Sequence, residues 1–413
     1  MISHMKTSPF APKSYPSMPE IKGVTCATTN AGIRYKTRHD ALLMRFSKDA
    51  QVAGVYTRSQ TSAAPVQWCR NACLDGHIDA LYVNSGNANA FTGQRGLDDA
   101  SALCSAIAQH YNTSPSHIMM SSTGVIGEFL PVENMLSAMP VLYDTQTTDS
   151  WDKAAHAIMT TDTFPKMATR TTKIDGVTVT INGIAKGSGM IAPNMATMLS
   201  YIVTDATLPA PILQSLLSRN TQKTFNCITV DGDTSTNDTV LLIATGEAQH
   251  IDIHTAADNR LDAFKEALHD IMQELATLIV KDGEGTTKFV TIYVTGAEDN
   301  EAARHIGLEV GNSPLVKTAF AAEDPNWGRI VMAVGKSEKW INQDALRIAI
   351  GNVVITDGGG CVRSDYVEDE ACAIMQQPEF SVHIDVGVGQ GSATIWTTDL
   401  TETYIKINAD YRS

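Results

Sequence analysis

Apolar and polar positions recur along the chain with two different periods. Residues 177–184 alternate as a strand does, with Val177, Val179 and Ile181 on one face and polar residues on the other. Residues 258–280 instead carry apolar side chains at steps of three and four, which predicts one long amphipathic helix that stops at Gly283. The apolar stripe of this helix comprises Leu261, Phe264, Leu268, Ile271, Leu275 and Leu278.

Shorter segments add further predicted helices and strands. Helices are expected at 98–111, opened by two aspartates, at 150–159 with Ser150 as the cap, and at 212–221 behind two prolines. Short apolar runs predict strands at 80–84, 118–122, 198–205 and 289–294. From Arg329 onward the pattern predicts mostly strands, at 329–335, 345–351, 352–357, 379–387, 392–400 and 403–408.

The order of these elements gives no sign of separate domains. No repeat of solenoid length, no low-complexity tract and no long linker rich in Pro, Gly and Ser interrupts it. We therefore expect an intertwined α+β chain without an obvious domain boundary.

The composition agrees with a folded protein and excludes several partners. The 413 residues are 43% hydrophobic and 18% charged, which is enough apolar material for a sizeable core. A net charge of −14 repels phosphate backbones, so nucleic acid is not expected as a partner. No run approaches the roughly 18 apolar residues of a membrane span, and the N-terminus lacks a secretory apolar segment, so we expect a cytoplasmic protein without membrane contact.

The cysteines and histidines indicate neither disulfides nor a metal centre. The seven cysteines are odd in number and scattered, which predicts free thiols in a reducing compartment. Cys69 and Cys73 have the spacing C-x3-C, but neither a second pair nor a histidine cluster completes a zinc site. The 11 histidines are scattered as well, and no metal is expected.

A glycine-rich segment at 186–197 has two interpretations. Gly187-x-Gly189-x-x-Ala192 after a strand matches a loose form of the dinucleotide fingerprint. Pro193 follows where a helix interior should continue, which disfavours that interpretation. A plain turn between strands is the simpler alternative.

Two further polar segments each allow a purely structural interpretation and a functional one. At 281–287, Glu284 lies between two glycines at a helix exit, either as part of a solvated cap or as a carboxylate that holds a cationic group in a cleft. Asp231-Gly-Asp233 resembles the start of a calcium loop, but the later ligands are missing, which favours a polar hairpin turn. No G-x-S-x-G, H-E-x-x-H or Walker A motif occurs.

Several segments, in order along nearly the whole chain, together resemble one family, the ornithine acetyltransferases (glutamate N-acetyltransferases). Each motif alone is weak evidence for the family, but the set of motifs together is specific to it. The pieces are NSGNANA (84–90), STGVIG (122–127), MTTDT (159–163), KGSGMIAPNMATM (186–198), KDGEG (281–285), EDPNWGR (323–329) and INADYRS (407–413).

The resemblance implies a fold and a processing event. The fold would be a layered α/β/α type related to the aminopeptidase DmpA, resembling the N-terminal nucleophile hydrolases. The precursor would cut itself between Ala196 and Thr197. The α chain (1–196) and the β chain (197–413) would stay intertwined in one catalytic unit, and two such units commonly form an α2β2 heterotetramer.

The implied reaction moves an acetyl group from N-acetylornithine to glutamate through Thr197. A threonine hydroxyl needs a base, and cleavage would supply the new α-amino group, whose ordinary pKa is about 7.7–8.0. Thr197 would attack the acetyl carbonyl, ornithine would leave, and glutamate would take the acetyl group from the acetyl-threonine ester. The Thr123 hydroxyl and the Gly124 N–H would stabilise the negative oxygen of each tetrahedral intermediate.

The resemblance also implies substrate contacts. Glu284 would pair with the side-chain ammonium of ornithine. Asn408 and Ser413, near the end of the chain, would bind the α-carboxylate end of the substrate. In the TTDT run, the choice among the threonines at 160, 161 and 163 stays open. The implied substrate positions are Thr160, Lys186, Thr197, Glu284, Asn408 and Ser413.

Competing functions remain at this point. No cofactor is implied, although acetyl-CoA stays open as a second acetyl donor. A DmpA-type aminopeptidase or amidohydrolase would use water instead of glutamate as the acceptor. A protein that binds NAD through residues 187–192 is the alternative from another class.

Overall fold

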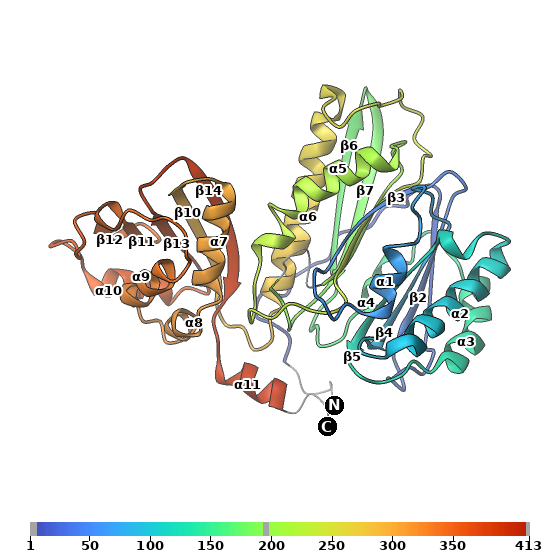
Figure 1. Cartoon of the computed structure of the whole chain (residues 1–413), viewed down its shortest axis with the longest axis horizontal. Helices are drawn as coiled ribbons and strands as arrows, with labels where there is room; N and C mark the ends of the chain where they lie inside the picture. The colour runs from blue at the N-terminus through green and yellow to red at the C-terminus, as the bar shows by residue number, and fades with distance from the viewer. Residues whose placement is uncertain (1–5, 193–197, 410–413) are drawn as a thin grey trace.

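Two sheets stack face to face because their central strands are apolar on both faces. In β9 (Thr239–Ala244), Leu241 and Ile243 belong to the core between the sheets, whereas the alternating residues face a helical layer. The period of two lets one strand contribute to two cores at once. The computed structural model describes residues 6–192 and 198–409 and has the predicted α+β fold, with helical layers enclosing the sheets (Figure 1).

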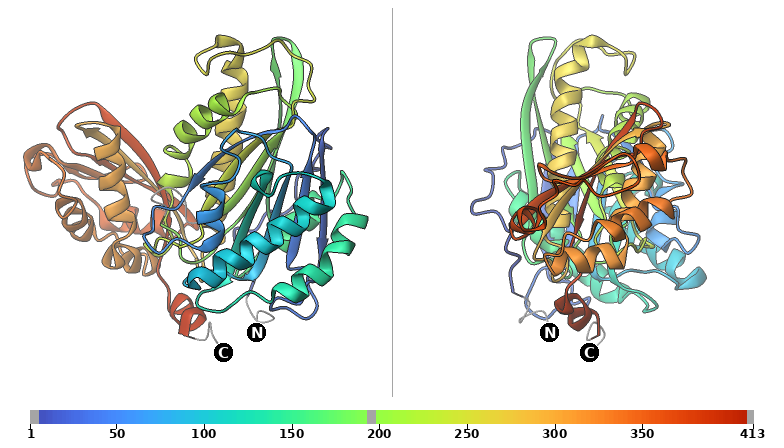
Figure 2. Two further views of the ribbon diagram at one scale, coloured as in Figure 1. Left: turned by 45° about the vertical axis from the view of Figure 1, so that its right-hand side comes forward. Right: turned by 90° about the vertical axis from the view of Figure 1, so that its left-hand side faces the viewer.

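The first sheet has four strands in the order β1-β2-β4-β5, and only β4 and β5 run parallel. Helices α2 and α3 cover its outer face (Figure 2), where Leu103, Ile107 and Leu142 are buried. The elements are β1 (Val24–Thr29), β2 (Ala41–Phe46), α1 (Ala64–Cys69), β4 (Ala80–Asn87), α2 (Gly93–Tyr111), the 3-10 turn η2 (Pro115–His117), β5 (Ile118–Val125) and α3 (Val132–Asp144).

The second sheet has five strands in the order β3-β9-β8-β7-β6. Helices α5 and α6 cover its outer face, and Trp151 of α4 is buried in the core between the two sheets. Strands β9 and β8, which follow residue 197, lie side by side in this sheet, with β3 on one side and β7 and β6 on the other, all from before residue 197. The remaining bounds are β3 (Gln51–Tyr56), α4 (Trp151–Ala157), β6 (Lys166–Ile174), β7 (Val177–Lys186), β8 (Leu199–Thr204), α5 (Ala210–Thr221), η3 (Phe225–Cys227), η4 (Asn259–Leu261) and α6 (Asp262–Lys281).

A C-terminal lobe, orange and red in Figure 1, carries a third sheet in the order β12-β11-β13-β10-β14. The sequence pattern did not predict this separate lobe, because no linker precedes it and its apolar core continues into that of α6. Its elements are β10 (Phe289–Ala297), α7 (Asn300–Gly311), α8 (Pro314–Ala321), α9 (Trp327–Gly335), η5 (Gln343–Ala345), β11 (Arg347–Ile350), β12 (Val353–Asp357), α10 (Glu368–Met375), β13 (Glu379–Asp385) and β14 (Gly391–Thr398), followed by α11 (Glu402–Ala409).

Several predicted elements are confirmed and others are wrong. The long helix at 258–280 is α6, extended at its start by η4. The predicted strands at 329–335 and 403–408 are wrong, because these residues form α9 and α11. In α9 the buried residues Ile330, Ala333 and Val334 follow helical spacing, and the Asn326 side chain accepts a hydrogen bond from the first turn.

Smaller differences concern helix starts. Helix α2 begins at Gly93 rather than at the predicted aspartates, and Ser150 shares a hydrogen bond with Thr147 instead of capping α4.

All seven cysteines are free thiols, as predicted. Within residues 6–192 and 198–409, no helix has both the length and the apolarity needed to cross a membrane.

Candidate active site

A cavity of about 250 Å³ opens where β5 and β7 end and β8 begins. Six of the predicted site residues line it together: Thr123, Gly124, Thr160, Lys186, Glu284 and Asn408. A larger cavity of about 970 Å³ lies between α6 and the C-terminal lobe, but none of the predicted site residues lines it. The small cavity is therefore the candidate active site.

Three predicted positions cannot be placed. Ala196, Thr197 and Ser413 lie outside the described residues. Met198, the residue after Thr197, is buried and lines the cavity, and its carbonyl accepts a hydrogen bond of 3.0 Å from the N–H of Thr239.

Gly124 occupies a position that no other residue fits. Its φ is +134°, and a Cβ there would lie 2.3 Å from the carbonyl carbon of Gly86 and 2.5 Å from the nitrogen of Asn87. Both clashes are with backbone atoms of β4, so they cannot be relieved by a side-chain rotation. The close approach lets the β5 backbone turn toward the cavity beside Thr123.

Lys186, the last residue of β7, contacts Thr123 at the wall of the cavity. Its Nζ donates to Thr123 Oγ1 at 3.3 Å, which leaves the hydroxyl proton of Thr123 free to point elsewhere. Burial lowers the pKa of Lys186, whereas the charges of Asp162 and Glu284 act in the opposite direction. Lys186 is therefore a buried amine whose positive charge is disfavoured by burial and favoured by two nearby carboxylates.

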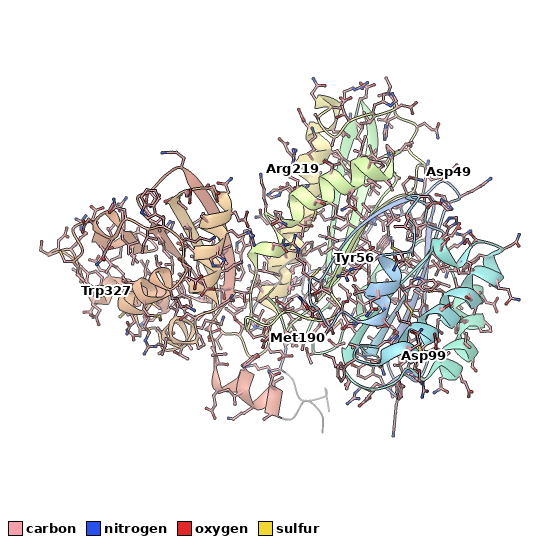
Figure 3. The ribbon with its side chains drawn as sticks, viewed as in Figure 1. Asp49, Tyr56, Asp99, Met190, Arg219 and Trp327 are labelled. Carbon is pink, nitrogen blue, oxygen red and sulfur yellow. The ribbon has the colours of Figure 1, made fainter. Side chains whose placement is uncertain are left out.

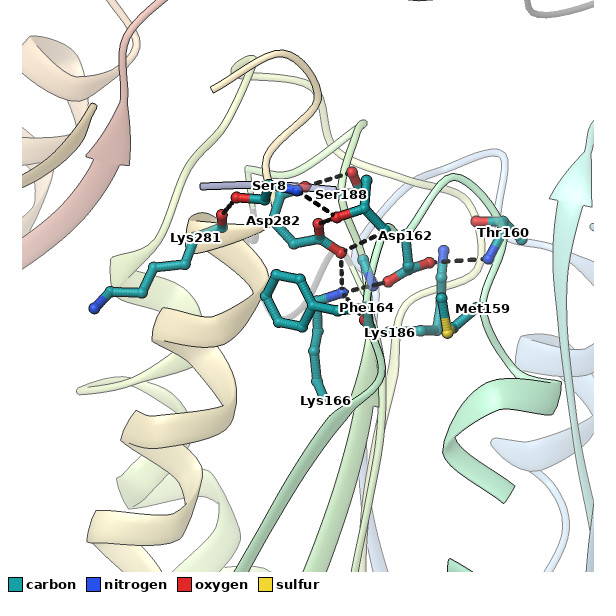
Figure 4. Close-up of polar contacts among 12 residues, drawn as sticks. Ser8, Met159, Thr160, Asp162, Phe164, Lys166, Lys186, Ser188, Lys281 and Asp282 are labelled. Atoms are coloured by element: carbon teal, nitrogen blue, oxygen red, sulfur yellow. Dashed lines mark hydrogen bonds and ion pairs between the residues drawn. The ribbon is translucent and has the colours of Figure 1, made fainter. Parts of the chain in front are cut away.

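A buried ion network lies beside the cavity residues Thr160 and Lys186 (Figure 4). The Nζ of Lys166 lies 2.7 Å from Asp162 and 2.6 Å from Asp282, and all three side chains are fully buried. Burial and a second carboxylate raise the pKa of Asp282. The pKa of Asp162 is lowered, because Lys166 and Lys186 together outweigh its own burial. Asp162 is therefore the more acidic of the two carboxyl groups.

The same network sets the spacing of the site. Asp162 accepts hydrogen bonds from the N–H of Thr160 at 2.9 Å and from the N–H of Gly187 at 2.7 Å. Asp282 is the C-cap residue of α6, two positions before Glu284, and the N–H of Glu284 donates to Ser188 at 3.1 Å. One ion cluster thus ties together the segments that carry Thr160, Lys186 and Glu284.

Glu284 is buried at the cavity wall, where its carboxylate accepts a hydrogen bond of 2.8 Å from Asn408 Nδ2. Burial raises its pKa above the usual value, although hydrogen bonds from Thr161 and Asn408 and the charge of Lys186 act against this shift. Gly189 makes room for the carboxylate, since a Cβ there would lie 2.5 Å from its carbon.

The three threonines of the TTDT run have different positions. Thr160 and Thr161 line the cavity. Thr163 does not line it and donates its N–H to Asp282 at 2.9 Å, so it belongs to the supporting network.

Asp231 supports one wall of the site, a role that the sequence pattern did not predict. Its carboxylate accepts the N–H groups of Met190 at 2.6 Å and Ile191 at 2.8 Å, and also the hydroxyl of Tyr404 at 3.1 Å. Met190 lies where the C-terminal lobe meets the main body (Figure 3). Asp231 therefore holds the segment that leads to residue 196, and Ser235, Thr236, Asn237 and Asp238 of the same loop line the cavity. The segment that begins at Asp231, which the sequence predicted to be a polar hairpin turn, therefore forms part of the cavity wall.

Comparison with known proteins decides the family. The sequence model of the ArgJ family matches residues 25–413. The chain belongs to the ArgJ family. It is 51% identical to the arginine biosynthesis bifunctional protein ArgJ of Agrobacterium fabrum over 98% of this chain and 99% of that protein. It is 50% identical to the ArgJ of Brucella suis, with the same coverage of both chains.

Solved structures of ArgJ relatives are also similar. The arginine biosynthesis bifunctional protein ArgJ of Bacillus halodurans is 39% identical, with a TM-score of 0.49, over 52% of this chain and 99% of that chain. An ornithine acetyltransferase of Mycobacterium tuberculosis, complexed with ornithine, is 31% identical, with a TM-score of 0.37, over 46% of this chain and 96% of that chain.

The buried network predicts a large effect of one substitution. Lys166→Met would leave two buried carboxylates without their cation, so we expect the free energy of unfolding to fall by about 3–5 kcal/mol in urea titrations. Lys265→Met is the control, because it removes a partly exposed partner of Asp262 and should cost about 0–1 kcal/mol. Equal stability of the wild type and Lys166→Met would contradict this account.

Proposed function

We propose that this ArgJ-family chain transfers the acetyl group of N2-acetyl-L-ornithine to L-glutamate, giving L-ornithine and N-acetyl-L-glutamate. The observation that carries the proposal is one cavity lined by Thr123, Gly124, Lys186 and Glu284, with Met198 next to them. It combines candidate oxyanion donors, a buried anion for an ammonium group, and the chain segment that directly follows Thr197.

The nucleophile in this proposal is Thr197, released by cleavage after Ala196. Lys186 of β7 pairs with Leu199 of β8 in an antiparallel ladder, and β8 also pairs with β9. The fragments 1–196 and 197–413 would therefore remain joined inside one sheet after the bond is cut. An α2β2 assembly is the expected oligomer.

The first half-reaction forms an ester and releases an amine. The α-amino group of Thr197 takes the hydroxyl proton as Oγ1 attacks the acetyl carbonyl. The Thr123 hydroxyl is positioned to donate to the resulting oxyanion, because its oxygen already accepts from Lys186, and the Gly124 N–H is the second donor. Collapse breaks the C–N bond, and the α-amine of ornithine leaves with the proton.

The second half-reaction is the reverse with a different amine. The α-amine of glutamate attacks the ester carbonyl, the same donors stabilise the oxyanion, and the proton returns to Thr197 Oγ1 as the C–O bond breaks. In this scheme Glu284 pairs with the side-chain ammonium of ornithine, Asn408 orients the Glu284 carboxylate, and Lys186 neutralises substrate carboxylate charge. Thr160 and Ser413 complete the proposed substrate contacts.

The acceptor distinguishes this proposal from a hydrolase of the DmpA type. With N-acetylornithine alone, we expect at most a slow release of ornithine after the first turnover, because water is a poor acceptor in a site shaped for an amine. Adding glutamate should accelerate release, with one N-acetylglutamate formed per ornithine and parallel double-reciprocal plots. Rapid ornithine release that glutamate does not change would support the hydrolase instead.

The role of Glu284 predicts a pH dependence of ornithine binding. Since burial raises the pKa of Glu284, the carboxylate is charged above that pKa and loses its charge, as pH falls, earlier than an ordinary glutamate. The Kd of L-ornithine, measured by calorimetry between about pH 4 and pH 7, should therefore rise toward acid.

Two variants test whether Glu284 is responsible. Glu284→Gln should weaken ornithine binding by about 10- to 100-fold near neutral pH and flatten the pH profile, because a charge-assisted hydrogen bond is lost. Glu266→Gln, an exposed glutamate on α6, should behave like the wild type. An unchanged profile in Glu284→Gln would exclude this role.

Asp231 offers a test of the cleavage step. The purified protein should give two bands on a denaturing gel, one of which begins TMLSYIV, and Thr197→Ala should give a single band. Asp231→Asn should slow cleavage, because an amide cannot accept both N–H groups of Met190 and Ile191. Asp233→Asn, in the same turn but exposed, is the matched control. Equal cleavage rates in both aspartate variants would remove Asp231 from this role.

A further inference from the structure

A second cluster of polar residues lies at the far end of the first sheet from the candidate active site. Asp79 directly precedes β4 and His117 directly precedes β5, and the parallel pairing of these strands brings the two residues together. The N–H of Asp79 donates to the carbonyl of His117 at 2.9 Å. Thr123 and Gly124 lie near the other end of β5, on the order of 20 Å away at about 3.3 Å per residue.

We propose that His77, Asp79 and His117 form a binding site for a divalent zinc-like cation. This inference is independent of the proposed acetyl transfer. Asp79 Oδ2 lies 3.3 Å from His77 Nε2 and 3.5 Å from His117 Nδ1, and all three atoms lie within 4.8 Å of one another. Bonds of about 2.0–2.1 Å in a zinc tetrahedron give edges of about 3.3–3.4 Å, and these two distances equal or slightly exceed them.

Asp75 provides the supporting contact that a metal-bound histidine needs. Its Oδ2 lies 3.1 Å from His117 Nε2, and its Oδ1 accepts a hydrogen bond of 3.1 Å from the backbone N–H of His77. A carboxylate on Nε2 holds the proton there and leaves the lone pair on Nδ1, which points toward Asp79. A lone pair and a carboxylate oxygen 3.5 Å apart repel unless a cation lies between them.

Asp79 keeps a lone pair for the cation. Arg45 Nη1 donates to Oδ1 at 3.0 Å, and the Thr113 hydroxyl donates to Oδ2, which has a second lone pair.

The exposure of the cluster suits an ion that enters from solvent. The side chains of His77 and His117 are 23% and 24% exposed, whereas that of Asp79 is 8% exposed. Two imidazoles and one carboxylate leave a fourth position for water, and nitrogen ligands favour Zn²⁺ or Co²⁺ over Mg²⁺ or Ca²⁺. Since the cluster joins the starts of β4 and β5, the bound ion would stabilise the sheet and take no part in the chemistry.

The competing occupant is a second proton on one imidazole, which would also satisfy Asp79. The experiment uses the full protein with Cys361→Ser, which removes the exposed thiol, after dialysis against a chelator. Calorimetry with ZnCl₂ and the visible spectrum with CoCl₂ measure stoichiometry and geometry. We expect one ion per chain, tetrahedral cobalt bands, and a Tm that rises with zinc, while acetyl transfer is unchanged.

Three substitutions assign the binding to this cluster. His117→Ala and, separately, His77→Ala should weaken zinc binding at least tenfold and abolish the rise in Tm, with circular dichroism of the metal-free protein confirming that each variant is folded. His305→Ala, an exposed histidine on α7, should bind like the parent. The proposal is overturned if zinc binding is not saturable, if both variants bind like the parent, or if Tm responds to pH alone. Should His117→Ala not fold, His77→Ala and the cobalt spectrum decide.

Discussion

The arrangement of the site depends on one ammonium group that no water reaches. Lys166 lies between Asp162 and Asp282, and burying these charges costs several kcal/mol per ion unless each finds a close partner. The two carboxylates pair with Lys166 and also accept hydrogen bonds from backbone N–H groups of the segments around them. The ion pairs therefore fix the positions of these segments as well as offsetting the cost of burial. Segments that come from a loop, a strand end and a helix end are thereby held at one spacing around the cavity.

Much of the fold was predictable where the apolar pattern is long and uniform. The stripe from Leu261 to Leu278 identifies α6, and the alternation from Val177 identifies β7. The pattern failed in the C-terminal lobe, where short apolar runs such as RIVMAVG suit a helix and a strand equally well. In TYIKIN the apparent alternation conceals a helix whose Tyr404 and Asn408, four residues apart, contact Asp231 and Glu284.

The site was predictable only in part, for a related reason. Resemblance to a family named six residues that line one cavity, whereas periodicity and spacing alone left Lys186 in a plain turn, Glu284 in a helix cap and Asn408 in a strand. The residues that hold those six in place were missed, because their partners are remote: Lys166 and Asp282 are 116 positions apart, and Asp231 meets Tyr404 across 173 positions. No local pattern encodes such a pair, and only tertiary packing creates it.

The contact between Asn408 and Glu284 has a consequence for how the chain can vary. The whole C-terminal lobe lies between these two residues, which are 124 positions apart in sequence but 2.8 Å apart in space. The lobe is thus a closed loop with both ends anchored at the cavity. The entropy of closing such a loop grows only with the logarithm of its length. Insertions or deletions inside the lobe therefore change little at its anchors, and the lobe is free to diverge in size and surface while the cavity stays the same.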